Sequence, residues 1–239
     1  MNGKKACVLM TAVMLAGCDG GTAAPRVVKR PTAAEQKITM EDPMTELKEH
    51  RSGEWSPELE EGEKATLFAI AWDTLRWCVR DEKEPFSFDK YTITPRLKED
   101  MATFVTLKIN DMLRGCIGSL APVEALYMSV HNNAVNASTR DFRFRPVTEK
   151  ELDGIDLHIS ILSPIKDIPS VEAFKIGEHG IIIEKGMHRA VYLPEVAVEQ
   201  NWTVEETLSS LSRKAGMSAD AWRKGTRFKV FSSVVLSEE

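Results

Sequence analysis

The sequence predicts an α+β fold in which helices flank one antiparallel sheet, with a smaller subdomain contributed by the region before residue 100. Two extended runs, 102–109 and 112–120, are separated by Asn110-Asp111, a pair typical of tight hairpin turns. The regular helical crossovers that a parallel sheet requires are missing, so the predicted sheet is antiparallel. Its other strands are predicted at 155–162, 180–193 and 227–236.

Length and charge narrow the class of protein. The chain has 239 residues, of which 43% are hydrophobic and 28% charged, as in globular proteins with a sizeable core. Its formal net charge is -5 at pH 7. General nucleic-acid binders carry a basic excess because they neutralise phosphates. The charge therefore argues against a nucleic-acid partner.

Residues 1–17 have the pattern of an export signal. Lys4 and Lys5 give a basic start, and the apolar run that follows is too short to span a bilayer. The run ends in Leu15-Ala16-Gly17-Cys18, which resembles the lipobox of bacterial lipoproteins, whose cysteine is lipidated. The resemblance implies that lipid on Cys18 attaches the chain to a membrane. An ordinary signal peptide with a chance cysteine, or a short buried helix, is the alternative.

Residues 18–58 are predicted to form a flexible linker, because glycines, prolines and charged residues interrupt any apolar periodicity. Such a linker would keep a folded domain, residues 59–239, clear of the lipid headgroups. The predicted location is the extracytoplasmic side of a bacterial cell membrane, which is the periplasmic face in a Gram-negative host. In such a host Asp19, directly after the lipidated residue, resembles an inner-membrane retention signal.

The helices of the domain are indicated by apolar spacing and capping residues. Apolar residues recur at helical spacing across 61–80, and Pro122 opens a second predicted helix that extends to residue 137. Gly216 is a stop signal for a later helix. Two capping boxes are predicted, one from Thr148 with Glu151 and one from Thr203 with Glu206.

The stretch 112–120 concentrates the reactive side chains of the predicted hairpin. Residues two apart share a face of a strand, so Arg114 and Cys116 are predicted to lie side by side, with Leu113 and Ile117 on the reverse face. A guanidinium beside a thiol favours the thiolate, which is the nucleophilic form. The alternative is that Cys116 is a small buried apolar residue, as free cysteines commonly are.

The register of this hairpin stays open. A two-residue turn places Val105 and Leu107 on the face of Cys116, whereas a three-residue turn places Thr106 and Lys108 there. A slip by one residue reverses every side chain of a strand. The polarity around Cys116 is therefore undecided from the sequence.

Two cysteines remain for the folded domain, because Cys7 leaves with the export signal and Cys18 takes lipid. Disulfides form in exported proteins, so a bridge between Cys78 and Cys116 is one alternative. Two cysteines alone do not indicate a disulfide framework. We therefore favour two free thiols.

The sequence around Cys116 resembles the signature of the AMMECR1 family. The matching strings are Phe104-Val105-Thr106-Leu107 and Leu113-Arg114-Gly115-Cys116-Ile117-Gly118. The resemblance extends over roughly residues 60–235 and implies a two-part α+β domain without an assigned reaction. Further segments that agree in order and spacing are Arg140-Asp141-Phe142-Arg143-Phe144, Ile159-Ser160-Ile161-Leu162-Ser163-Pro164, His179-Gly180-Ile181-Ile182, Tyr192-Leu193-Pro194-Glu195-Val196 and Lys214-Ala215-Gly216.

Arg140, Asp141 and Arg143 are candidate binding residues. Guanidinium groups bind carboxylates and phosphates through paired hydrogen bonds, so this loop can form an anion site. Alternatively, Asp141 pairs locally with an arginine while the neighbouring phenylalanines enter the core. Arginines in loops serve both uses, and both interpretations stay open.

Cys116, Arg114 and His179 form the candidate catalytic set. Cysteine and histidine can act as nucleophile and base, and their separation in sequence does not limit their distance in the fold. No metal is predicted, because CxxC and HExxH are missing and the five histidines are dispersed. No cofactor is predicted, because neither standard Gly-rich phosphate loop occurs.

Two classes of function follow from these residues. The first is a lipid-anchored module that binds a small molecule or a protein in a cleft near Arg114 and Cys116. The second is an enzyme that uses Cys116 as a nucleophile on a small molecule or on the cell envelope. Thiol reactivity separates the two classes, because an exposed thiol of low pKa favours the enzyme.

Overall fold

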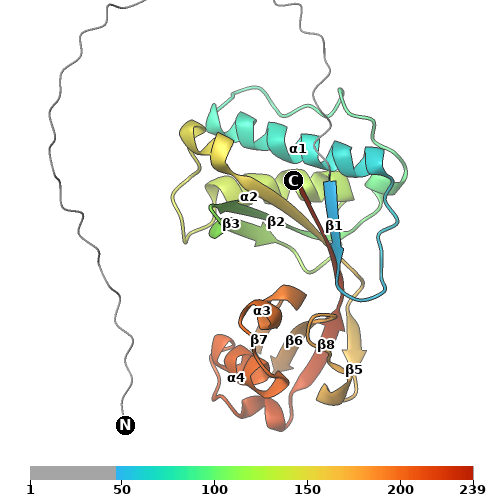
Figure 1. The fold of residues 1–239 in the computed structure, drawn as a ribbon, viewed down its shortest axis with the longest axis vertical. Coiled ribbons are helices and arrows are strands. Elements are labelled where there is room, and N and C mark those ends of the chain that lie inside the picture. Colours follow the sequence, from blue (N-terminus) through green and yellow to red (C-terminus); the bar gives the residue numbers. More distant parts are fainter. Residues whose placement is uncertain (1–46, 239) are drawn as a thin grey trace, which may run out of the picture. The chain divides into compact units, whose positions relative to one another are not determined.

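A computed structural model describes residues 47–238 of the chain (Figure 1). The predicted export signal, the lipidation residue Cys18 and Asp19 lie outside the described residues. The predicted linker ends earlier than residue 58, because Leu47–Arg51 forms strand β1. Its charged sequence concealed this strand, in which Glu49 forms a salt bridge with Lys64 at 2.6 Å.

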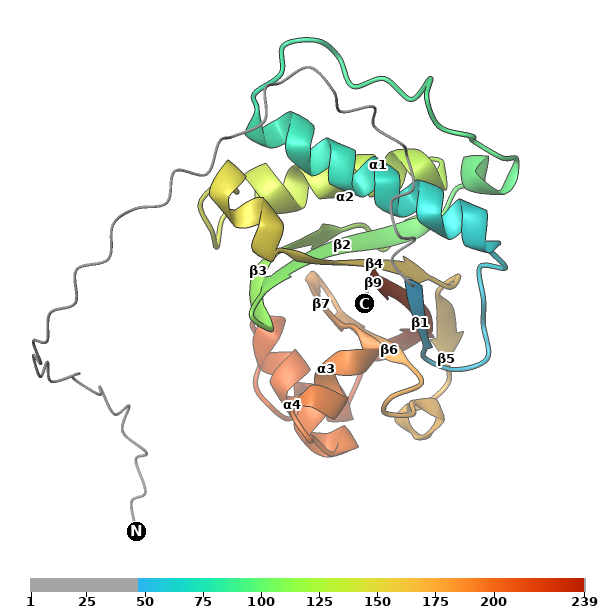
Figure 2. The same ribbon diagram turned by 45° about the horizontal axis from the view of Figure 1, so that its top comes forward.

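The larger of two sheets has five strands in the order β1-β9-β4-β2-β3, and all its neighbours are antiparallel. Helices α1 and α2 cover one face of this sheet (Figure 2). The strands after β1 are β2 Ala102–Ile109, β3 Met112–Gly118, β4 Asp156–Leu162 and β9 Ser233–Glu238. The helices are α1 Glu61–Val79 and α2 Leu126–Thr139.

The smaller sheet has four antiparallel strands in the order β5-β8-β6-β7. Its strands are β5 Lys166–Ile168, β6 Gly180–Lys185, β7 His188–Tyr192 and β8 Arg227–Phe231. Two helices belong to this part, α3 Pro194–Glu199 and α4 Val204–Lys214. Short 3₁₀ helices lie at Arg96–Lys98, Glu149–Gly154, Val171–Ala173 and Ala221–Arg223.

The predicted α+β class with antiparallel strands is confirmed, but the prediction of a single sheet is wrong. The predicted strand 227–236 is divided at Ser232, so that β8 joins the smaller sheet and β9 joins the larger one. The smaller part is also not built from the region before residue 100, because β1 and α1 belong to the larger sheet and its helical layer. Strand periodicity identifies strands, whereas sheet membership depends on pairings distant in sequence.

The predicted helix signals are mostly confirmed. Helix α1 matches the predicted span 61–80 to within one residue. Helix α2 begins later than predicted, at Leu126, and Pro122 lies in the turn before it. Both predicted capping boxes form, at the start of the 3₁₀ helix Glu149–Gly154 and at the start of α4.

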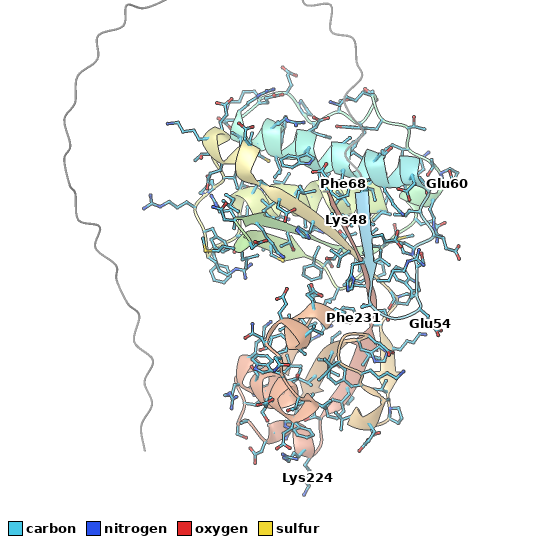
Figure 3. The ribbon with its side chains drawn as sticks, viewed as in Figure 1. Lys48, Glu54, Glu60, Phe68, Lys224 and Phe231 are labelled. Carbon is cyan, nitrogen blue, oxygen red and sulfur yellow. The ribbon has the colours of Figure 1, made fainter. Side chains whose placement is uncertain are left out.

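The second face of the larger sheet packs against the smaller sheet at one end only. Ala102 and Leu162 of the larger sheet form a buried apolar cluster with Ile182 and Phe231 of the smaller one. Figure 3 labels Phe231 where the two parts meet. A Cβ at Gly180 would collide with the Phe231 ring, so a glycine is needed there. Beyond this cluster the same face of the larger sheet opens into a cleft.

Candidate functional site

The turn of the central hairpin is a two-residue turn at Asn110-Asp111. Both residues have positive φ, 51° and 61°, which is the conformation of turns that match the twist of paired strands. Ile109 consequently pairs with Met112. This pairing is the first of the two registers that the sequence left open.

A β-bulge then shifts the hairpin into the second register. Lys108 pairs with Leu113, but Thr106 pairs with Cys116, which leaves Arg114 as the extra residue. The bulge therefore puts Leu113 and Cys116 on the same face, together with Thr106 and Lys108. A bulge changes the alternation that the sequence argument assumed, so the predicted reverse position of Leu113 is wrong.

Arg114 does not lie beside the thiol, contrary to the prediction. Its Nε donates to Glu151 Oε1 at 2.7 Å, its Nη2 donates to the carbonyl oxygen of Pro146 at 3.2 Å, and its guanidinium lies over the Phe144 ring. Hydrogen bonds from Arg114 lower the pKa of Glu151 to about 2. Arg114 thus fastens the start of the 3₁₀ helix to β3 and contributes nothing to the lining of the cleft.

Asp141 and Arg143 clamp the backbone of Cys116 from the open side of β3. Strand β3 is an edge strand, so its outward peptide groups lack a strand partner. The Cys116 amide donates to Asp141 Oδ2 at 2.9 Å, and Arg143 Nη2 donates to the Cys116 carbonyl oxygen at 3.0 Å. The two side chains therefore take the place of a neighbouring strand and hold Cys116 in position.

The clamp is itself a tight ion pair. Arg143 Nη2 lies 2.6 Å from Asp141 Oδ2, and Arg143 Nε donates to Oδ1 at 2.9 Å. Asp141 is buried, and these bonds lower its pKa to about 2. The local pairing of Asp141 is thus the correct interpretation of this loop, although Phe142 is 95% exposed and does not enter the core. Arg140 points elsewhere, towards Asn136 of α2.

The Cys116 thiol is half-buried and held as an acceptor. Thr106 Oγ1 donates to its sulfur at 3.2 Å. Burial raises the pKa of the Cys116 thiol, while the Thr106 hydrogen bond and the charge of Arg143 act in the opposite direction. Both cysteines of the described residues, Cys78 and Cys116, are free thiols, as predicted. Cys116 is therefore neither a fully buried apolar residue nor an activated thiolate.

A cleft of about 640 Å³ lies over this thiol. Its floor is the open face of the larger sheet, where Cys116, Thr106, His158 and Ser237 pair in one row across β3, β2, β4 and β9. Its volume is within the range of small-molecule pockets. The floor is polar because alternate residues of these strands turn away from the helices.

Helix α3 forms the opposite wall of the cleft. Glu195 and Glu199 of this helix line it, facing Lys108, Arg143 and His50 of the other side. Glu195 is half-buried, and burial raises the pKa of its carboxyl, while the charges of Lys108 and His50 lower it. Charged groups of both signs therefore meet a ligand in this cleft.

Residues that sequence reasoning missed are His158 and Glu195. The alternation of β4 correctly put Asp156, His158 and Ser160 on one face, and the His158 ring lies 2.7 Å from Asp156 Oδ2. Nothing in the sequence showed that this face lines a cleft rather than open solvent. The only signal for Glu195 was its place in the string Tyr192–Val196.

The structure does not bring His179 to Cys116. His179 lines a different pocket, of about 670 Å³, together with Trp55, Lys166 and Lys175. Its Nδ1 accepts a hydrogen bond from the Lys175 amide at 3.2 Å. A Cys116–His179 pair is therefore not formed, because β6 carries His179 to the end of the smaller sheet away from the cleft.

Two searches of the described residues were negative. Between residues 47 and 238, no cluster of three or more histidine, cysteine or acidic side chains has the arrangement of a metal site. Within the same range, no helix combines the length and the apolar character that crossing a bilayer requires.

The chain is similar to proteins of one family. The AMMECR1 family matches residues 68–236. A protein of Methanosarcina barkeri is 34% identical over 178 residues, covering 71% of this chain and 87% of that protein. A protein of Methanocaldococcus jannaschii is 41% identical over 133 residues, or 53% of this chain and 66% of that protein. The crystal structure of an uncharacterised protein of Pyrococcus horikoshii matches with a TM-score of 0.67 at 28% identity, covering 75% of this chain and 93% of that one.

Proposed function

The chain belongs to the AMMECR1 family, and we propose that it is a membrane-anchored, extracytoplasmic module that binds a small molecule or a protein segment in the cleft over Cys116. The observation that carries the proposal is the open polar face of the larger sheet. Polar residues on a sheet face that is walled by a helix give a ligand fixed hydrogen-bonding groups without any rearrangement of the fold.

Binding is favoured over thiol chemistry by the state of Cys116. A nucleophilic cysteine needs a lowered pKa or an adjacent base. Here burial raises the pKa of the thiol, and Thr106 rather than a histidine contacts the sulfur. An enzyme that uses Cys116 as nucleophile on a small-molecule or cell-envelope substrate stays the second candidate, because Arg143 supplies a nearby positive charge.

A cleft-filling variant tests the binding proposal. Ser237 lies half-exposed on the cleft floor, so Ser237→Trp should fill the cleft without disturbing the core face of β9. A fragment library screened by amide chemical shifts should give hits on wild-type protein whose shifts map to the cleft. These hits should be lost in Ser237→Trp and kept in Ser218→Trp, a matched change at an exposed position. Hits that map elsewhere, or that survive Ser237→Trp, would contradict the proposal.

The anchor is proposed from Leu15-Ala16-Gly17-Cys18. Two or more acyl chains on one residue exceed the single-chain anchoring that gives only reversible membrane binding. Cys18→Ala should therefore release the protein from membranes or leave a longer precursor, as membrane fractionation and intact mass would show. Cys7→Ala is the matched control and should change neither. A Cys18→Ala protein that is still cleaved and membrane-bound would rule the anchor out.

A further inference from the structure

Opposite walls of the cleft carry opposite charges. Lys108 of β2, His50 of β1 and Arg143 of the clamp line the side of the larger sheet, whereas Glu195 and Glu199 line the side of α3. The exception is Asp111, an exposed acidic residue at the tip of the hairpin turn. A ligand that crosses the cleft therefore passes from a basic side to an acidic one.

Glu195 is the acidic group of this wall that most needs a partner. It is half-buried, and within residues 47–238 no salt bridge reaches it; Lys108 and His50 act on it only as charges across the cleft. A carboxylate removed from water without a partner is costly, and the cost is recovered when a cation or hydrogen-bond donor arrives. Lys108 is likewise half-buried and forms no salt bridge with any described residue. Two opposite charges thus face each other across a space instead of pairing directly.

The remaining lining limits the kind of ligand. Leu193, Pro194 and Val196 supply short apolar surface on the α3 side, and the sheet side supplies hydroxyl groups. No phenylalanine, tyrosine or tryptophan is among the lining residues. Sugars and nucleobases usually stack on such rings, so the lining does not suit them. Short aliphatic groups fit this mixture of apolar and hydroxyl surface.

We propose that the cleft binds a small aliphatic zwitterion, of the class of amino acids and short peptides, with its ammonium group at Glu195 and its carboxylate at Lys108. The inference rests on the proposed binding function and adds the substrate class. Arg143 is already engaged by Asp141 and Cys116, so Lys108 is the basic group free to take the carboxylate. Each end of the ligand meets a charge of opposite sign, and its short side chain meets the apolar wall.

Dialanine and its blocked forms test the inference on the full-length protein. Titrations followed by amide chemical shifts would compare dialanine with N-acetyl-dialanine, which lacks the ammonium group, and with dialanine amide, which lacks the carboxylate. Dialanine should bind at least about tenfold more tightly than either blocked form, because each lost charge removes a charge-assisted hydrogen bond. This comparison needs no variant and so does not depend on a mutant that folds.

Two isosteric variants assign the ends of the ligand. Glu195→Gln should abolish the preference for dialanine over N-acetyl-dialanine but keep its preference over dialanine amide, and Lys108→Gln should do the reverse. Equal affinities for all three probes, or no binding of dialanine, would overturn the inference. If fragments still bind in the cleft and are displaced by Ser237→Trp, the proposed binding function survives that failure. If both variants lose both preferences together, the ends are not held by these residues and the assignment is also overturned.

Discussion

The two faces of the five-stranded sheet are made by alternate residues of the same strands, and they differ in almost every property. Leu107, Leu157 and Ile159 face the helices and are fully buried among apolar neighbours. Thr106, His158 and Ser237 face the cleft and keep part of their surface accessible. One face therefore supplies the apolar burial that stabilises the domain, and the other supplies groups that can bind a ligand.

This difference shows how a small domain carries a site without weakening its core. In a strand, a change at one residue acts on one face and leaves the other face in place. Gly115 keeps the helix side of β3 tight, because a Cβ there would collide with the Ala137 carbonyl oxygen of α2. We therefore expect stability and binding to respond to different, alternating positions along each strand.

The largest effect is expected on the helix side of β4. Ile159→Ala should lower the free energy of unfolding by about 2–5 kcal/mol, because it leaves a cavity in a fully buried cluster. His158→Ala, one residue away on the cleft side, should lower it by about 1 kcal/mol or less. Urea unfolding of both variants measures the contrast. Equal losses would mean that the cleft face is also part of the folded core.

The fold class was predictable because it depends on local patterns. Alternation over 155–162 and the turn residues Asn110-Asp111 identify strands and a hairpin directly. The assignment of β8 and β9 to different sheets was not predictable, because only the break at Ser232 separates them. Strand β1 was missed because its charged residues find partners, such as Lys64, that lie outside the strand.

The next effect concerns the clamp at the edge of β3. The pKa of Asp141 is lowered from its ordinary value of 3.8 to about 2, so this carboxylate stabilises the fold above about pH 4. That stability is lost as the pH falls towards 2, because protonation breaks the bonds to Arg143. We expect its contribution to be about 1–2 kcal/mol, since Arg143 is partly exposed.

Asp141→Asn should therefore destabilise the protein at pH 7 and flatten the loss of stability between pH 4 and pH 2. Urea unfolding at several pH values measures both. Asp153→Asn changes an exposed acid and is the matched control, which should keep the wild-type slope. An unchanged slope in Asp141→Asn would show that the clamp adds no pH-dependent stability.

The candidate site was predictable only in part. Cys116 and Arg143 do line the cleft, as their residue types suggested. Arg114 was misplaced because a bulge, which no sequence pattern marked, removes it from the alternation. Glu195 was missed because a short helix that is distant in sequence brings it over the sheet, and pairing through space has no local signal.

The smallest effect separates the two arginines on either side of β3. Arg143 acts on the Cys116 thiol through its charge and lowers the thiol pKa, whereas Arg114 is turned towards Glu151. Arg143→Gln should therefore raise the thiol pKa and slow alkylation of Cys116 at neutral pH by about two- to fivefold. Arg114→Gln should leave the rate unchanged. Peptide mass spectrometry reads Cys116 separately, and Cys78 in the same sample is the internal control. A slower reaction in Arg114→Gln alone would put the reactive arginine back where simple alternation predicts it and would remove the bulge from the explanation of the site.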